Sequence, residues 1–179
     1  MSTTSGLLLL LGGARSGKSA LAVELGRRHD GPVTFVATLD PFDDELTARV
    51  GRHRAERPDW PTIEERLDLA AALRRADGLV IVDCLTLWIN NLLQRGDTDD
   101  EIEALAVGTA SMAAERSEPT IVVSNEVGLS VHPETPLGRR YRDVLGRVNQ
   151  RWAARAQRSL LLVAGRAVRL DDPADVLRP

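Results

Sequence analysis

The stretch Leu7-Leu8-Leu9-Leu10-Leu11-Gly12-Gly13-Ala14-Arg15-Ser16-Gly17-Lys18-Ser19 decides the fold of this chain. Its second part matches G-x-x-x-x-G-K-S, which forms a phosphate-binding loop when a strand precedes it and a helix follows. The leucine run predicts the buried strand, and the segment Ser19–Arg28 predicts the helix. In such a loop, backbone N–H groups surround a phosphate, the lysine reaches the β- and γ-phosphates, and the next hydroxyl ligates Mg²⁺. The stretch therefore predicts binding of a nucleoside triphosphate.

Lys18 is the only lysine of the chain, and the other 22 basic residues are arginines. Arginine- and alanine-rich coding explains the arginines, but it leaves Lys18 as a position where arginine does not serve. An ammonium is a compact point charge, whereas a guanidinium is a wide planar fork. The pattern favours a site at Lys18 that is shaped for the smaller cation.

Short apolar runs alternate with longer amphipathic stretches, which predicts a parallel sheet with helices on both faces. The predicted strands are Leu7–Leu11, Val33–Thr38, Leu79–Cys84, Thr120–Ser124 and Leu160–Ala164, and Ala167–Leu170 could add a short antiparallel edge strand. The predicted helices are Ser19–Arg28, Asp43–Arg57, Glu64–Ala76 and residues 85–95, 100–116 and 136–157. The predicted fold class is α/β, a three-layer P-loop NTPase-like domain that resembles RecA, and we expect residues 1–179 to form this single domain.

The composition argues against several classes of protein. The formal net charge of −3 argues against a dedicated nucleic-acid or polybasic membrane binder. A single cysteine, Cys84, excludes an intramolecular disulfide framework and a multi-cysteine metal site. The run Leu7–Leu11 is too short to span a membrane, and no basic residue precedes it as in a secretory signal. We therefore expect a cytoplasmic protein without a membrane span.

Polar residues follow two of the predicted strands. Asp83 comes directly after four apolar residues, and beside a phosphate-binding loop it is a candidate ligand of Mg²⁺, directly or through water. The alternative for Asp83 is a turn or helix-capping role. Asn125 and Glu126 follow the strand Thr120–Ser124, and the carboxyl ends of such strands face the ligand crevice. These two side chains could face the γ-phosphate or the acceptor, and turn chemistry is an equal alternative.

The segment from Asp43 to Pro58 contains a histidine among arginines. On a helix, Arg49, His53 and Arg57 are spaced four residues apart and share one face. Neighbouring cations disfavour the charged imidazole, so we expect His53 to be neutral and therefore nucleophilic. Its attack on the α-phosphorus of a nucleotide would give a phosphoramidate and release pyrophosphate. The alternative is a solvated helix on which His53 has no role.

The order of motifs closely resembles one family. G-G-A-R-S-G-K-S is followed by A-T, D-D-E-x-x-x-R-V-x-x-H-R, R-P-x-W, D-C-L-T, N-E-V-G and G-R-V-N-Q-R, over nearly the whole chain. The phosphate-binding loop occurs in many families, but the histidine segment, N-E-V-G and G-R-V-N-Q are together specific. The family is the bifunctional adenosylcobinamide kinase / adenosylcobinamide-phosphate guanylyltransferase of cobalamin biosynthesis.

This resemblance implies two reactions on one chain. Adenosylcobinamide is phosphorylated with ATP or GTP, and GMP then passes from GTP to adenosylcobinamide phosphate through a guanylylated histidine, giving adenosyl-GDP-cobinamide. Together with the phosphate-binding loop, it makes His53 and Lys18 the candidate catalytic residues and Ser19 and Asp83 the candidate Mg²⁺ ligands. Expected nucleotide contacts are Gly12, Gly13, Ala14, Arg15, Ser16, Gly17, Lys18, Ser19, Ala37, Thr38, Leu39, Arg54, Ala55, Glu56, Arg57, Glu64 and Asp83. The resemblance also implies a propeller-like homotrimer.

Two other functions stay open on the sequence. One is a monofunctional P-loop kinase for another substrate, in which His53 is idle. The other is a nucleotide-dependent interaction module without transfer chemistry. The sequence identifies neither the corrinoid-binding residues nor the preference for ATP or GTP in the kinase step.

Overall fold

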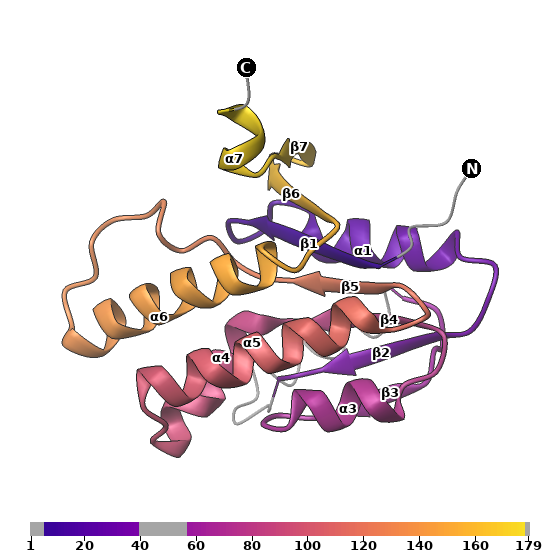
Figure 1. Cartoon of the computed structure of the whole chain (residues 1–179), viewed down its shortest axis with the longest axis horizontal. Helices are drawn as coiled ribbons and strands as arrows, with labels where there is room; N and C mark the ends of the chain where they lie inside the picture. Colours follow the sequence, from indigo (N-terminus) through magenta and orange to yellow (C-terminus); the bar gives the residue numbers. More distant parts are fainter. Residues whose placement is uncertain (1–5, 40–56, 178–179) are drawn as a thin grey trace.

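A computed structural model describes residues 6–39 and 57–177, and Figure 1 shows how their elements are arranged. The described strands form one seven-stranded sheet in the order β3-β2-β4-β5-β1-β6-β7. The strands are β1 (Leu7–Gly12), β2 (Val33–Ala37), β3 (Thr62–Glu64), β4 (Leu79–Asp83), β5 (Thr120–Val123), β6 (Arg158–Val163) and β7 (Arg166–Leu170). The helices are α1 (Lys18–Arg27), α3 (Leu69–Arg75), α4 (Leu85–Arg95), α5 (Asp99–Glu115), α6 (Pro136–Ala153) and α7 (Pro173–Val176). None of the described helices is long and apolar enough to cross a membrane.

The core lies on both faces of the sheet, because successive side chains of a strand point to opposite sides. Leu7, Leu9 and Leu11 of β1 pack with apolar residues of α3, α4, α5 and α6. Leu8 and Leu10 pack on the other face, where α1 contributes its apolar side chains. All five leucines are buried, so the run that precedes the phosphate-binding loop belongs to the core on both faces of the sheet.

The predicted fold class is confirmed. In the spatial order of the sheet, each strand from β3 through β6 is parallel to its neighbours. Strand β7 is antiparallel to β6, as the sequence allowed for an edge strand at Ala167–Leu170. Helix α5 begins with a capping box, in which Thr98 accepts a hydrogen bond from the backbone N–H of Glu101 while the Glu101 carboxylate accepts from the backbone of Thr98. The predicted helix Asp43–Arg57 lies outside the described residues except for Arg57.

The predicted helix Glu64–Ala76 was wrong in its first turn. Thr62–Glu64 is a strand instead, and it pairs with Phe35–Ala37 of β2. The helix begins only after Asp68, whose carboxylate accepts a hydrogen bond from the backbone N–H of Ala71 at 2.8 Å. A three-residue strand is too short to show a periodic pattern in the sequence. It forms because it pairs with the neighbouring strand β2.

The turn between β6 and β7 contacts the phosphate-binding loop. Ala164 and Gly165 both have positive φ angles, 50° and 73°, as a two-residue hairpin turn requires. The backbone N–H of Gly165 donates to the carbonyl oxygen of Ser16 at 3.0 Å. The hairpin, which lies near the top of Figure 1, is therefore attached to the loop at its turn.

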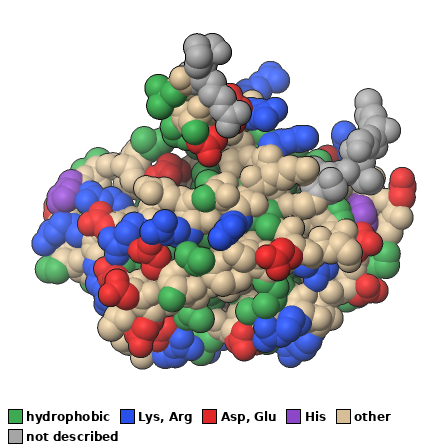
Figure 2. Space-filling view, viewed as in Figure 1, with side chains coloured by type: hydrophobic (Ala, Val, Ile, Leu, Met, Phe, Trp, Pro, Cys, Tyr) green, Lys and Arg blue, Asp and Glu red, His purple; other side chains and the backbone are tan. Residues whose placement is uncertain are grey.

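Ion pairs connect α5 to α6 at the surface, where Figure 2 shows acidic and basic side chains side by side. Asp99 lies 2.7 Å from both Arg140 and Arg147, and Glu103 pairs with Arg147 and Arg151. These arginine side chains are 40–53% exposed, so each pair contributes at most about 1 kcal/mol. The two helices are held mainly by the apolar side chains beneath them.

Candidate active site

The carboxyl ends of β1, β5 and β4 lie next to one another and carry the polar residues that the sequence singled out. Strand β5 lies between the other two, so Asn125 follows a strand that separates the phosphate-binding loop from Asp83. In Figure 1 the arrows of β5 and β2 point in the same direction, so their carboxyl ends lie at the same edge of the sheet. Ligands of open α/β sheets bind outside these strand ends.

Gly12 is required where β1 turns into the loop. Its φ angle is +147°, and an added Cβ would lie 2.3 Å from the carbonyl oxygen of Leu162 and 2.8 Å from the hydroxyl of Ser16. The register pairs Gly12 with Leu162 of β6, so the backbone cannot move away without breaking the sheet. A side chain at Gly12 is therefore excluded both by the backbone conformation and by the neighbouring strand.

We expect Gly12→Ala to lower the free energy of unfolding by about 3 kcal/mol or more and to abolish activity. Gly96→Ala is the matched control, because Gly96 also has a positive φ, 99°, but no atom lies within 4 Å of an added Cβ. Its cost is the backbone strain alone, about 1–2 kcal/mol, with activity retained. Urea unfolding of both variants checks this, and equal losses would contradict the close approach to β6.

Lys18 lies within the phosphate-binding loop and is only 8% exposed. Its Nζ donates to the carbonyl oxygens of Gly12 at 2.8 Å and Gly13 at 2.6 Å. It also lies 3.3 Å from the Ser16 hydroxyl and 2.9 Å from Oδ1 of Asn125. An ammonium has three N–H donors, and all four neighbouring acceptors are oxygen atoms within 3.3 Å of it. The surroundings fit the small cation that the lone lysine predicted.

Burial lowers the pKa of Lys18, and the nearby Asp83 and Cys84 oppose this by favouring the charged form. Burial and the adjacent Asp83 carboxylate raise the pKa of Cys84 to about 12, so its thiol is neutral at pH 7. The Asp83 carboxylate therefore lies close enough to Lys18 to favour its ammonium form.

Asn125 and Glu126, which the sequence left open between site and turn, have different roles. Asn125 accepts a hydrogen bond from Lys18 and so belongs to the site. The Glu126 carboxylate accepts from the backbone N–H of Gly128 at 2.9 Å, which closes the turn after β5. The backbone N–H of Glu126 donates to the carbonyl oxygen of Gly12. The described contacts of Glu126 are thus those of a turn residue.

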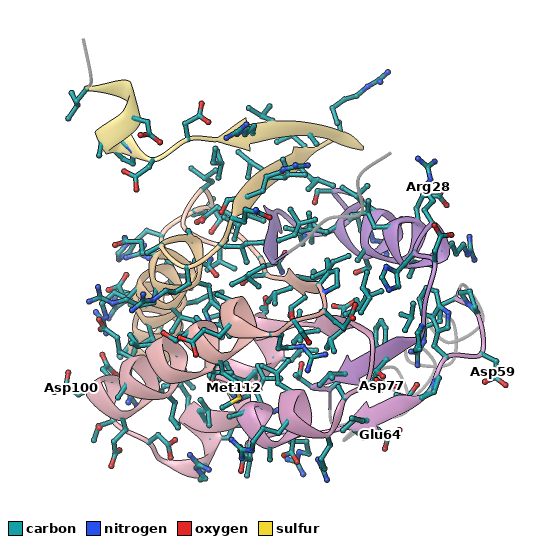
Figure 3. All side chains as sticks on the ribbon, turned by 45° about the vertical axis from the view of Figure 1, so that its right-hand side comes forward. Arg28, Asp59, Glu64, Asp77, Asp100 and Met112 are labelled. Carbon is teal, nitrogen blue, oxygen red and sulfur yellow. The ribbon has the colours of Figure 1, made fainter. Side chains whose placement is uncertain are left out.

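Ala37, Glu64 and Asp83 lie level with one another at the ends of three neighbouring strands, because Ala37 pairs with both other residues. Glu64 is exposed on the edge strand β3, as Figure 3 shows. Thr38 is fully buried, and its hydroxyl donates to the carbonyl oxygen of Cys84 at 2.7 Å and accepts from the backbone N–H of Cys84 at 2.8 Å. The hydroxyl thus joins β2 to β4 and fixes the positions of the residues on either side of Thr38.

The predicted guanylyl site is described only in part. His53 lies outside the described residues, as do Arg49, Arg54, Ala55 and Glu56. Arg57 is described: its guanidinium stacks 3.8 Å from the ring centroid of Phe35 and donates to the hydroxyl of Thr62 at 3.0 Å. Arg57 therefore lies over β2 and the edge strand β3, where a cation–π contact holds it.

Ser19 and Asp83 fit the ligand chemistry of Mg²⁺. Both present hard oxygen atoms, Ser19 at the start of α1 and Asp83 at the end of β4. Within residues 6–39 and 57–177, no group of three or more His, Cys, Asp or Glu side chains could hold a metal ion by itself. Mg²⁺ commonly takes one or two protein ligands and completes its shell with water and substrate phosphates. A site of this kind therefore suits Mg²⁺ bound together with a nucleotide.

Sequence reasoning missed two residues that hold Asn125. The backbone N–H of Asn125 donates to the hydroxyl of Thr86, and the Asn149 amide donates to the carbonyl oxygen of Asn125. Thr86 is the last residue of D-C-L-T, and Asn149 lies in G-R-V-N-Q. Both motifs were visible in the sequence, but neither spacing indicated a contact with N-E-V-G.

Comparison with known proteins adds the identity of the family. A family model described as cobinamide kinase / cobinamide phosphate guanyltransferase matches residues 8–170. The bifunctional adenosylcobalamin biosynthesis protein CobP of Pseudomonas aeruginosa is 45% identical over 164 residues, which cover 88% of this chain and 92% of that protein. The bifunctional adenosylcobalamin biosynthesis protein CobU of Escherichia coli is 38% identical over 180 residues, which cover 92% of this chain and 99% of that protein.

The fold also occurs in a distant solved structure. A protein of Pyrococcus horikoshii OT3 superimposes with a TM-score of 0.58, covering 96% of this chain and 89% of that one at 11% sequence identity. So low an identity shows only a shared fold. The residues that the family model matches include the phosphate-binding loop and the ends of β4 and β5. The chain belongs to the cobinamide kinase / cobinamide phosphate guanyltransferase family.

Proposed function

We propose that this chain phosphorylates adenosylcobinamide and then transfers GMP from GTP to adenosylcobinamide phosphate. The observation that carries the proposal is the placement of Lys18 in its loop, beside Asp83 and Asn125, in a chain of this family. Phosphoryl transfer requires positioning and charge stabilisation more than covalent chemistry, and these residues supply both.

In the kinase step, the hydroxyl of the acceptor attacks the γ-phosphorus of ATP or GTP, the nucleoside diphosphate leaves and the hydroxyl loses its proton. Backbone N–H groups from Gly12 to Ser19 surround the phosphates, and Lys18 neutralises charge on them. Mg²⁺, held by Ser19 and Asp83, would supply further charge stabilisation at the phosphate oxygens. Ala37, Leu39 and Glu64 complete the proposed nucleotide contacts at the ends of β2 and β3, and the buried Thr38 supports them through its hydrogen bonds to Cys84.

In the guanylyl step, a nitrogen of the His53 imidazole forms a bond to the α-phosphorus of GTP and pyrophosphate leaves. An oxygen of adenosylcobinamide phosphate then attacks the same phosphorus, which breaks the bond to His53 and gives adenosyl-GDP-cobinamide. Arg54, Ala55, Glu56 and Arg57 are the proposed nucleotide contacts around this histidine. The support is the position of His53 among arginines, which favours a neutral and nucleophilic imidazole.

Intact-mass measurement after incubation with GTP and Mg²⁺ tests the second activity. We expect an adduct with the mass of GMP, mapped by peptide analysis to His53. A monofunctional kinase would phosphorylate its acceptor without forming this adduct. An interaction module would bind nucleotide without turnover on any corrinoid. Either result would contradict the proposed function. We also propose that the protein acts in the cytoplasm, where ATP and GTP are available.

We further propose that the chain assembles as a homotrimer. Val163, Val168 and Leu170 share one face of the β6–β7 hairpin and are 59%, 58% and 39% exposed. Exposed apolar side chains on an edge strand favour contact with another chain. Light scattering at micromolar concentration should give three times the mass of one chain, and Val168→Glu should lower it. Leu105→Glu, at an exposed position of α5, is the control, and a monomeric wild type would contradict the proposal.

A further inference from the structure

Three motifs that lie far apart in the sequence meet around Asn125. Asn125 is the second residue after β5, Thr86 is in the first turn of α4, and Asn149 is near the end of α6. The proposed chemistry assigns no role to Asn149, which touches the phosphate-binding loop only through its neighbours. It is 4% exposed, although an asparagine side chain is normally solvated.

The backbone of Asn125 is held from two sides. Its N–H donates to the hydroxyl of Thr86 at 2.9 Å, and its carbonyl oxygen accepts from Nδ2 of Asn149 at 3.0 Å. The opposite side of the Asn149 amide is also fixed, because the Ser124 hydroxyl donates to its Oδ1 at 2.7 Å. A carbonyl oxygen can only accept, so Nδ2 of Asn149 must face it, and the amide has one orientation.

The fixed backbone directs the side chain of Asn125 to the phosphate-binding loop. Its Oδ1 accepts from Nζ of Lys18 at 2.9 Å, while the other acceptors of Nζ belong to Gly12, Gly13 and Ser16 of the loop itself. Among the residues that the structure describes, Asn125 is thus the one hydrogen-bond partner of Lys18 from outside the loop. A shift of Asn125 would therefore shift the ammonium relative to the phosphates that it has to meet.

We infer that Asn149 is a positioning residue for phosphoryl transfer, because it fixes Asn125, whose amide oxygen holds the ammonium of Lys18. The inference rests on the proposed kinase activity. Asn149 does not touch the reacting atoms and acts only through Asn125. Helix α6 is thereby linked to the phosphate-binding loop through a chain of two amides. Small displacements of a charge-stabilising group reduce the rate of a transfer step even when substrates still bind.

A double-mutant cycle with Asn149→Leu and Asn125→Ala tests this inference. Each single variant is expected to lower the kcat of cobinamide phosphorylation by about tenfold or more, while the KM for cobinamide changes by less than about twofold. The double variant should be no slower than Asn125→Ala alone, because Asn149 has nothing left to position. Effects that multiply, or an unchanged kcat in Asn149→Leu, would overturn the inference.

Thr34→Val separates positioning from a general loss of stability. Thr34 is also buried, and its hydroxyl donates to the carbonyl oxygen of Asp77 at 2.8 Å, at the amino end of β2. This variant should lower the melting temperature as Asn149→Leu does, but keep kcat within about twofold of wild type. An equal loss of kcat in Thr34→Val would show that stability alone is responsible.

The inference can fail independently of the proposed function. If wild type phosphorylates no cobinamide, the proposed function is wrong. The affinity of wild type, both single variants and the double variant for ATP is then measured by calorimetry instead of kcat. Affinity should fall in Asn149→Leu and should not fall further when Asn125→Ala is added. If wild type phosphorylates cobinamide and the cycle is additive, only the positioning role of Asn149 is wrong.

Discussion

Replacing His53 by asparagine is expected to abolish GMP transfer almost completely while cobinamide phosphorylation stays within about tenfold of wild type, or ~1.4 kcal/mol of barrier. The two steps need different geometries, because the acceptor of the kinase step attacks the γ-phosphorus and the guanylyl nucleophile attacks the α-phosphorus. A residue that forms the bond in one step is dispensable in the other. Separate assays with cobinamide and with cobinamide phosphate measure the two rates.

The chemical behaviour of the GTP label identifies the bond. A phosphoramidate on His53 should be labile in acid and stable in base, unlike an ester on Ser or Thr. His29→Asn is the matched control, since His29 follows α1 in a turn and should label like wild type. Arg57→Ala should weaken labelling less than His53→Asn, because an arginine stabilises charge without forming the bond. Wild-type GMP transfer by the His53 variant would replace the covalent route by direct attack of the cobinamide phosphate.

Replacing Lys18 by alanine is expected to abolish or severely lower both activities, because both steps have to hold a triphosphate. Lys18→Arg should fail as well, since the guanidinium is wider than the ammonium and the position is enclosed by Gly12, Gly13 and Asn125. The loss should appear in both assays, unlike the selective loss in the His53 variant. ATP affinity and both rates are the measurements.

The folded state of the Lys18 variants has to be controlled, because Lys18 also makes hydrogen bonds within the protein. Arg28→Ala is a suitable reference, since Arg28 is an exposed cation whose pair with Glu24 lies within one helical turn. It should change neither melting temperature nor activity measurably. Near-normal kinase activity in Lys18→Arg would refute the explanation given for the single lysine of the chain.

Much of the site could be predicted from the sequence, because it depends on short local patterns. The phosphate-binding loop requires glycines and Lys18 at fixed spacing between a strand and a helix, and both elements have the expected type. Asp83 follows an apolar run, and its place near the loop could be predicted because the carboxyl ends of parallel strands meet at one edge of the sheet. The antiparallel edge strand that the sequence allowed at Ala167–Leu170 is also present as β7. These features need only neighbouring residues to form.

Contacts between distant segments needed the tertiary structure. The strand Thr62–Glu64 exists because β2 offers it free hydrogen-bonding groups, and no periodic pattern announces it. For both Asn125 and Glu126 the sequence left a role in the ligand crevice and a role in a turn equally open. In the structure Asn125 accepts a hydrogen bond from Lys18, whereas the Glu126 carboxylate accepts one within the turn. Asn149 meets Asn125 only because the packing of α6 on α4 and α5 places it beside the residues that follow β5, 24 positions earlier in the chain. Hydrogen bonds between side chains depend on ångström distances, and these are set by the packing of the helices on the sheet, not by the spacing of residues along the chain.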